Sequence, residues 1–229
     1  MQETKCSDDK FPYSAFEAAG YEVAHVGYHQ WNGVALISRI GLENVREHFP
    51  SQPGFNKDPE KPQKREARAV GATCGGVDIW SLYIPNGREI GDRHYDYKLE
   101  FLWRLADAVE PGTPQVFCGD YNIAPTDKDV WNRAFFEGKT HVTEPERAAF
   151  DNLLESGLSP AEHEEPYSYW DYKAMRFQKN EGMLIDFQLS GLEGRGFVDK
   201  HEREGKGASD HAPVVADYDV TRMLIDDVR

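Results

Sequence analysis

The sequence contains few cysteines and no long hydrophobic run. Its three cysteines, Cys6, Cys74 and Cys118, are scattered along 229 residues without the close spacing of metal-binding pairs. We therefore expect free thiols in a reducing cytoplasm. No run approaches the roughly 18 apolar residues that a membrane-spanning helix needs. No charged-then-apolar leader opens the sequence, so we expect a cytoplasmic protein that does not contact membranes.

Positive charge is also scarce. The chain has 26 lysines and arginines against 40 aspartates and glutamates, which gives a formal net charge of −14. Proteins that hold nucleic acid tightly without sequence preference normally use a basic surface, so this balance argues against that class. Clustered carboxylates, however, bind hard divalent cations, and such ions reverse the local field. A metal-dependent enzyme that acts on phosphates is therefore compatible with the charge.

The apolar pattern predicts many strands and a few amphipathic helices. Apolar side chains recur on one helical face over residues 92–109, and Thr143 with Glu146 forms a capping box for a helix that runs to Leu154. No repeat or flexible linker divides the chain, so we expect residues 1–229 to form one α/β domain with two packed sheets flanked by helices. The predicted strands are residues 21–26, 33–38, 67–73, 77–84, 115–118, 183–189 and 213–218, with a Gly-Gly hairpin turn between the third and the fourth.

Polar residues gather at the ends of these apolar runs. The stretch VFCGDYNIAP, residues 116–125, begins as a buried strand and continues into Asp120 and Asn122. Strand ends are places where a rigid scaffold can aim side chains at a common point, although each such cluster alone is more often a turn or a solvated loop. A buried carboxylate without a partner is costly, so we expect the set to converge. Its other members are Glu3 in QETK, Tyr83 and Asn86 in SLYIPNG, Asp186 in MLIDFQL, and Ser209-Asp210-His211 before APVVADY.

The ordered motifs QETK, YIPNG, GDYN, SYWDY, IDF and SDH resemble the exonuclease III branch of the endonuclease/exonuclease/phosphatase superfamily. The segments WNGVA, EARAVGATCGG and HYDYKLEFL are most similar to its actinobacterial members, and the resemblance runs from Gln2 to about Tyr218. It implies a four-layer α/β/β/α sandwich of two mixed sheets flanked by helices. It also implies a monomeric, Mg²⁺-dependent enzyme of base-excision repair. Such an enzyme cleaves duplex DNA 5′ to abasic sites and removes nucleotides 3′→5′ from duplex ends.

The resemblance assigns catalytic roles to five residues. Hydrolysis of a phosphodiester needs a cation, an activated water and support for charge on the leaving oxygen. Asp120 would orient or deprotonate the water, and Asn122 would donate to the phosphate or hold that water. Asp186 would fix the tautomer of His211 and favour its charged form, so that His211 can contact a phosphate oxygen. Tyr83 would hydrogen-bond the phosphate. The sequence leaves open whether Asp120 or a metal-bound hydroxide is the base.

The resemblance also implies metal and substrate contacts. Glu3 and Asp210 would bind Mg²⁺, which Mn²⁺ could replace. A flipped-out abasic sugar needs a small, dry pocket. The aromatic and apolar residues near SYWDY would line that pocket unless they are ordinary core, and basic side chains would contact phosphates unless they are merely solvated. The predicted substrate-binding residues are Asn86, Arg88, Lys98, Tyr169, Trp170, Arg176, Met183 and Ile185.

Two departures from the family pattern lead to further expectations. Where the family reads Arg-Gly-Leu-Arg-Ile-Asp, this chain has EGMLID at residues 181–186. Two cations are lost and one anion is gained beside the expected DNA groove. We therefore expect weaker DNA binding and a flatter salt dependence, by about one unit of slope per lost contact. The sequence also begins after the position of the first family strand, so we expect a shortened form with impaired metal binding.

Two other functions stay open. The same metal site could serve a superfamily phosphatase or a lipid phosphodiesterase, although the segments SYWDYKAMRFQ and HYDYKLEFL favour the DNA branch. A shortened, catalytically impaired chain could instead only bind nucleic acid or a partner.

Overall fold

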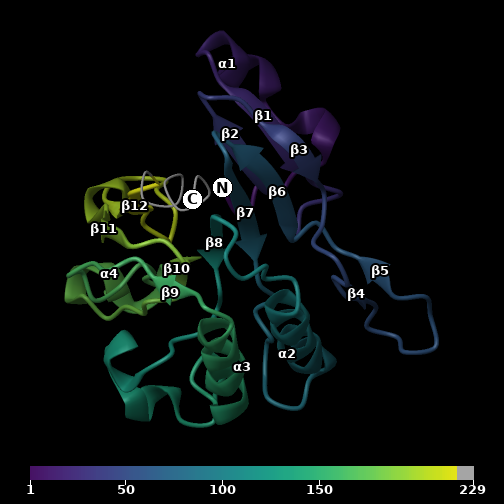
Figure 1. Ribbon diagram of the computed structural model, residues 1–229. Coiled ribbons are helices and arrows are strands. Elements are labelled where there is room, and N and C mark those ends of the chain that lie inside the picture. The colour runs from purple at the N-terminus through teal and green to yellow at the C-terminus, as the bar shows by residue number, and fades with distance from the viewer. Residues whose placement is uncertain (221–229) are drawn as a thin grey trace.

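The structure, a computed structural model, describes residues 1–220 (Figure 1). A six-stranded mixed sheet lies at its centre, in the order β3-β6-β7-β8-β10-β9. β7 and β8 run parallel, and the other neighbouring strands are antiparallel. The strands are β3 (Glu43–Arg46), β6 (Ala69–Cys74), β7 (Val77–Tyr83), β8 (Gln115–Asp120), β9 (Ser159–Pro160) and β10 (Asp186–Ser190).

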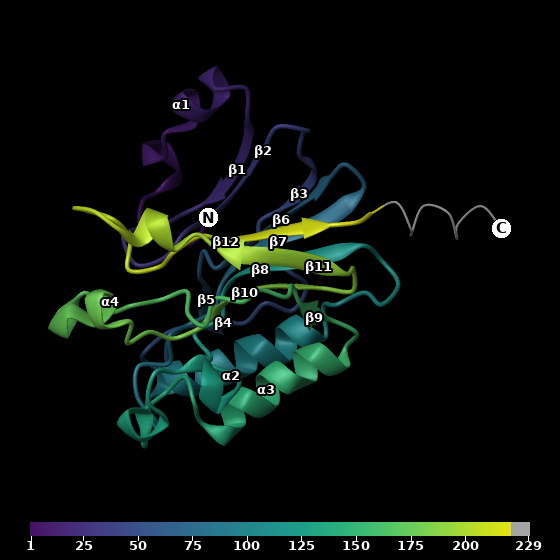
Figure 2. The same ribbon diagram turned by 90° about the vertical axis from the view of Figure 1, so that its left-hand side faces the viewer.

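Two hairpins cover one face of this sheet, and two helices cover the other (Figure 2). The β1–β2 hairpin contacts β6 and β7, and the β11–β12 hairpin contacts β10 through β12. Helix α1 packs on β1, which gives the predicted order of helix, sheet, sheet and helices. Among residues 1–220 the second sheet is formed by these two separate hairpins. The elements are α1 (Tyr13–Ala18), β1 (Glu22–Val26), β2 (Val34–Ser38), α2 (Arg93–Ala106), α3 (Glu144–Glu155), β11 (Gly194–Val198) and β12 (Val214–Tyr218).

The central strand β7 shows how the layers are held together. Side chains alternate across a strand, and Trp80 and Leu82 belong to the core under α2 and α3, whereas Ile79 and Tyr83 belong to the core under the β1–β2 hairpin. Because both faces are buried, β7 reads as a nearly continuous apolar run. The remaining short elements are β4 (Gly54–Phe55), β5 (Lys64–Arg65), α4 (Arg176–Lys179) and 3₁₀ turns at Asp8–Lys10, Asp127–Asp129, Arg133–Phe136, Lys173–Met175 and Lys200–Arg203.

The predicted helices and most of the predicted strands occur, with adjusted ends. The Thr143–Glu146 capping box is present, and Asp92 caps α2 by accepting from the N–H of His94 over 2.7 Å. Residues 183–185 precede β10, and Met183 makes isolated bridges with Val130 and Tyr169 instead of a ladder. Several short elements were not predicted, because they lack a clear apolar period: α1, β3, β4, β5, β9, α4 and β11. No helix within residues 1–220 is long and apolar enough to cross a membrane.

Candidate active site

Three strands of the central sheet bring polar side chains into one row. Tyr83 is the partner of Asp120 across β7–β8, and Asp120 is the partner of Asp186 across β8–β10. Directly opposed residues share a face of a sheet, so the three side chains project to the same side. The glycine before Asp120 permits this close pairing, because a Cβ atom at Gly119 would lie 2.0 Å from the carbonyl oxygen of Leu82. The row forms the floor of the candidate site.

Asn122 holds the carboxylate of Asp120 by both oxygens. Its backbone N–H donates to Oδ1 and its side-chain amide to Oδ2, each over 2.8 Å. The φ of Asn122 is 53°, in a left-handed region that asparagine tolerates better than most residues. The amide also donates to the carbonyl of Ile84 over 3.0 Å. Both amide hydrogens are therefore used within the protein, and Asn122 orients Asp120. Its contact with the phosphate or with the attacking water stays a prediction.

His211 forms an ion pair with Asp186, which lies at the end of the row away from Tyr83. Its Nδ1 atom lies 2.8 Å from Oδ2 and 3.1 Å from Oδ1 of Asp186. The buried Ser168 donates its hydroxyl to the same Oδ2 over 2.6 Å, and so fixes the carboxylate. With Nδ1 engaged, Nε2 is the ring nitrogen that can donate to a substrate. Ser168 was not among the predicted site residues, although it lies within the SYWDY motif.

Burial and neighbouring charges shift two pKa values in the row. Burial raises the pKa of Asp120 to about 7; His211 opposes this rise and the charge of Asp186 adds to it. Burial alone would lower the pKa of His211, but the ion pair with Asp186 and further acidic neighbours raise it to about 10. At neutral pH His211 is therefore a cation, and Asp120 titrates in the range that suits a general base.

Glu3 enters the site from the N-terminal segment. The amino group of Met1 donates to the carbonyl of Ala35 over 2.8 Å, which holds this segment beside β2. Glu3 has a φ of 54° and forms an ion pair with Lys5 over 2.9 Å. Burial would raise the pKa of the Glu3 carboxyl group, but hydrogen bonds with Tyr83 and Lys5 lower it overall. Glu3 is therefore an anion at neutral pH.

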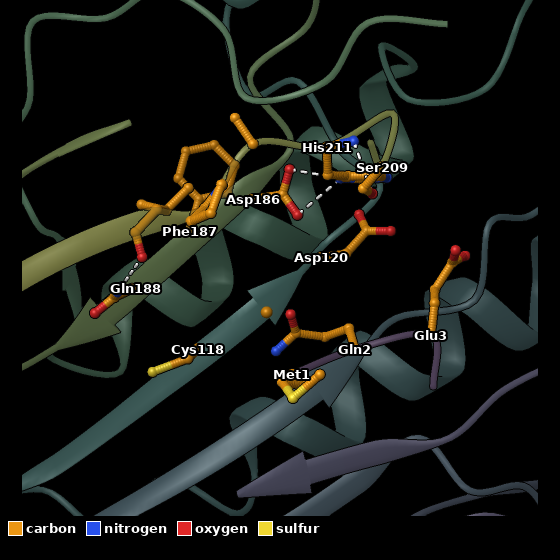
Figure 3. A pocket seen from close by; sticks show the side chains of 14 residues that line it. Met1, Gln2, Glu3, Cys118, Asp120, Asp186, Phe187, Gln188, Ser209 and His211 are labelled. Carbon is orange, nitrogen blue, oxygen red and sulfur yellow. Dashed lines mark hydrogen bonds and ion pairs between the residues drawn. The ribbon is translucent and has the colours of Figure 1, made fainter. Parts of the chain in front are cut away.

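These groups surround one cavity of about 440 Å³. Figure 3 shows Asp120, Asp186 and His211 grouped on one side, with the segment that carries Glu3 across from them. The four residues are far apart in sequence, and all four line the cavity. The hydrogen bond between Tyr83 and Glu3 joins the floor of the site to this segment. The structure thus brings the predicted acidic and cationic groups together.

The donor groups fit a magnesium ion that keeps part of its water shell. Within residues 1–220, no three His, Cys, Asp or Glu side chains come together closely enough to hold an ion. Mg²⁺ typically uses one or two protein carboxylates and fills its other positions with water and substrate phosphate. Glu3 supplies such a carboxylate in the cavity. Asp210 does not line the cavity, and its charge acts on Lys5 and Tyr169. Its charge also favours the cation of His211, so Asp210 contributes to the field of the site, and direct metal binding by Asp210 stays a prediction.

Lys98 does not contact solvent, so the prediction that it binds a DNA phosphate is wrong. It is 0% exposed, forms an ion pair with Glu146, and donates to the carbonyl of Asn122 over 2.6 Å. The sequence carried a signal for this placement. Lys98 follows Tyr95 by three residues and precedes Leu102 by four, so it lies on the buried face of α2.

Three residues predicted to line the sugar pocket belong to the core. Trp170, Met183 and Ile185 are 1%, 7% and 2% exposed and pack in apolar clusters behind the site. None of them lines the cavity around Asp120, so the alternative of ordinary core holds for these three. Tyr169 does lie at the site, where its ring centroid is 4.9 Å from that of His211.

Arg176 is the first residue of the short helix α4, and its charge is compensated. Its guanidinium lies 4.6 Å from the ring centroids of both Trp131 and Phe135, and it forms an ion pair with Glu181. Leu184 stands where the family pattern has an arginine. It packs in the main core, whereas we expected this position to face an open groove. Of the departures from the family pattern at residues 181–186, Glu181 is the one that changes the charge available for contact with DNA.

Asn86 and Arg88 lie on the other side of Tyr83. Both are exposed, and they line a second hollow of about 300 Å³ together with Tyr83 and Trp31. Asn86 donates to Oδ1 of Asn122 over 3.0 Å, and so supports the Asp120 turn. Arg88 stays a candidate for contact with a phosphate.

The chain matches the model of the Endonuclease/Exonuclease/phosphatase family over residues 1–211. The chain belongs to this family. Exodeoxyribonuclease III of Haemophilus influenzae is 29% identical to it, over 95% of this chain and 88% of the relative. The 3′ phosphatase NExo from Neisseria, solved with a product DNA hairpin, has 32% identity and a TM-score of 0.82, over 95% of this chain and 87% of that one. An AP endonuclease from Archaeoglobus fulgidus has 29% identity and a TM-score of 0.82, over 96% and 88%.

These comparisons confirm the family inferred from the motifs and the α/β fold. This protein is an enzyme of the family. The relatives that it matches include exonucleases and endonucleases. Nucleases of this family depend on a divalent metal ion.

Proposed function

We propose that this family member is a Mg²⁺-dependent DNA phosphodiesterase of base-excision repair. It cleaves duplex DNA 5′ to abasic sites and removes nucleotides 3′→5′. The observation that carries the proposal is the cavity in which Glu3, Asp120, Asp186 and His211 meet. The names of an exodeoxyribonuclease III, an AP endonuclease and a DNA-bound neighbour support DNA as the substrate.

Each site residue has its own role in the proposed hydrolysis. Asp120, oriented by Asn122, accepts a proton from the attacking water as the new P–O bond forms and the P–O3′ bond breaks. The Nε2–H of the charged His211 donates to a non-bridging phosphate oxygen, where negative charge develops. Tyr83 adds a hydroxyl beside the same row. Mg²⁺ at Glu3, when bound, would polarise the phosphate and stabilise the leaving oxygen.

A nicking assay tests the proposal. Purified protein is incubated with Mg²⁺ and an oligonucleotide duplex that contains one abasic analogue, and both new ends are identified. We expect a 3′-hydroxyl and a 5′ sugar phosphate, and loss of cleavage with a chelator or in Asp120→Asn. The control Asp151→Asn removes an exposed carboxylate of α3 and should leave cleavage unchanged. Absence of cleavage by the folded wild-type protein would refute the proposal.

A second candidate is removal of a 3′-terminal phosphate, because one structural neighbour is described as a 3′ phosphatase. The same cavity could hold a terminal phosphate in place of a diester. Release of phosphate from a 3′-phosphorylated duplex, without nicking of the abasic duplex, would favour this activity. Release from inositol phosphates would favour a phosphatase outside the DNA branch.

A further inference from the structure

A buried ion pair beneath the active-site floor is not used in the proposed reaction. Lys98 of α2 and Glu146 of α3 are both wholly buried and form this pair. Lys98 also donates to the carbonyl of Asn122 over 2.6 Å, and Glu146 accepts from the N–H of Thr143 over 3.1 Å. The pair therefore connects two helices to the turn that follows β8.

His141 contacts the side-chain amide of the same turn. Its Nε2 lies 3.1 Å from Oδ1 of Asn122, and its Nδ1 lies 3.0 Å from the hydroxyl of Thr140. Asn86 donates to the same Oδ1 over 3.0 Å. The amide oxygen can only accept, so a hydrogen bond from His141 to it requires the tautomer with the hydrogen on Nε2. In that tautomer Nδ1 accepts from the hydroxyl of Thr140, which also lies 3.4 Å from the carbonyl of Arg88, and Nε2 lies 3.3 Å from the side-chain nitrogen of Asn86.

His141 keeps this donor role throughout the neutral range. Burial lowers the pKa of its imidazole to about 3, and the charge of Lys98 adds to this effect. Glu146 acts in the opposite direction, and the more distant His211 cation also disfavours protonation. The neutral ring therefore presents a single N–H group to Asn122.

In the tautomer with the hydrogen on Nε2, two donors meet on one oxygen and favour one orientation of the Asn122 amide. If the amide turned over, its NH₂ group would face the N–H groups of His141 and Asn86. In the observed orientation the nitrogen instead faces Asp120 and Ile84, at 2.8 Å and 3.0 Å. The choice between these orientations therefore decides whether the Asp120 carboxylate receives its second hydrogen bond.

We propose that His141 is a positioning residue: it locks the Asn122 amide in the orientation that holds the Asp120 carboxylate, while Lys98 and Glu146 hold the backbone of the turn. Loss of His141 removes one of the two donors that fix the amide. The carboxylate then loses a partner that favours its charged form and its alignment. The consequence for catalysis rests on the proposed function, whereas the consequence for Asp120 itself does not.

The test compares His141→Ala and His141→Gln with the control His201→Ala, which removes an exposed histidine. We expect His141→Ala to lower kcat about 10-fold to about 100-fold with little change in KM, because a displaced catalytic group costs rate and not ground-state binding. The acid limb of the kcat profile should move to higher pH. His141→Gln, which keeps an N–H donor, should recover part of the rate, and His201→Ala should match the wild type.

A second measurement needs no activity. The apparent pKa of Asp120 is measured by ¹³C NMR of its carboxyl carbon, assigned by comparison with Asp120→Asn. We expect it to rise in His141→Ala and to stay unchanged in His201→Ala. If the wild type cleaves no DNA, the proposed function fails and this titration still decides the role of His141.

Thr140→Val offers a milder perturbation if His141→Ala does not fold. It removes the hydroxyl that contacts Nδ1 and should shift the Asp120 pKa in the same direction by a smaller amount. An unchanged Asp120 pKa in every folded variant would overturn the inference. A lowered unfolding temperature with an unchanged acid limb and unchanged kcat would also overturn it, because His141 would then only support the fold.

Discussion

Asp120 and Asp186 are direct partners in the antiparallel register of β8 and β10, and both line the same cavity. Two carboxylates opposed on one face of a sheet repel each other. The cation of His211, 2.8 Å from Asp186, compensates part of this repulsion. The charge on each of these three residues therefore depends on the charges of the other two, and this dependence can be measured.

Replacement of Asp120 should change how stability depends on pH. The pKa of Asp120 is 3.8 in its ordinary state and about 7 in the fold, so the folded protein binds more protons between these values. The contribution of Asp120 to stability is therefore greatest at acid pH and falls as the pH rises through this interval. In the presence of chelator we expect Asp120→Asn to have a higher unfolding temperature than the wild type at about pH 8 and a similar one at about pH 4. Thermal unfolding by circular dichroism measures both, and a lower unfolding temperature for Asp120→Asn at the alkaline pH would contradict the assignment.

Asp186→Asn should lower the pKa of His211. The carboxylate is the main group that favours the imidazolium, and loss of an adjacent opposite charge typically shifts a pKa by about 1–3 units. A ¹H–¹⁵N NMR titration of the imidazole ring measures the change. Asp92→Asn is the matched control, because Asp92 contacts His94 over 2.7 Å in another Asp–His pair. An unaltered His211 titration in Asp186→Asn would show that other groups hold its proton.

Removal of one partner of the buried Lys98–Glu146 pair should lower the free energy of unfolding more than removal of both partners. Lys98→Met leaves a buried carboxylate without its cation, which typically costs about 3–5 kcal/mol of unfolding free energy. The double variant Lys98→Met, Glu146→Leu removes both charges and should be more stable than Lys98→Met. Urea unfolding of the wild type, both single variants and the double variant completes the cycle. Additive losses in the double variant would mean that the two side chains do not interact.

Glu181→Gln should strengthen DNA binding. Glu181 neutralises Arg176, so its replacement releases a cation that lies over Trp131 and Phe135. Each additional phosphate contact steepens the dependence of log K on log salt by about one unit. Affinity for a short duplex, measured by fluorescence anisotropy at several salt concentrations in chelator, gives the slope. Glu17→Gln makes the same charge change on the exposed surface of α1 and should leave the slope unchanged. Equal slopes for both variants would place Arg176 outside the DNA contact.

Local features of the chain were predicted well because the groups that decide them lie close together in sequence. The capping box of Thr143 and Glu146 spans three residues, and the Gly75-Gly76 turn joins two adjacent strands. The family motifs also led to Glu3, Asp120, Asp186 and His211. The orientation of a side chain within a motif was harder to predict. The two hydrogens of the Asn122 amide are used by Ile84 and Asp120, and only one of these is a sequence neighbour.

The amino-acid sequence alone was enough to predict the longer strands and helices and the motifs that follow the buried runs, because short-range periodicity and turn chemistry act between neighbours. The contacts of each polar side chain depend on how distant segments pack together. Lys98 became a buried partner of Glu146, and His141 became a donor to Asn122, through packing of α2 and of the α3 cap against the turn after β8. Burial in a low dielectric, and the charges that burial brings together, are properties of that packing.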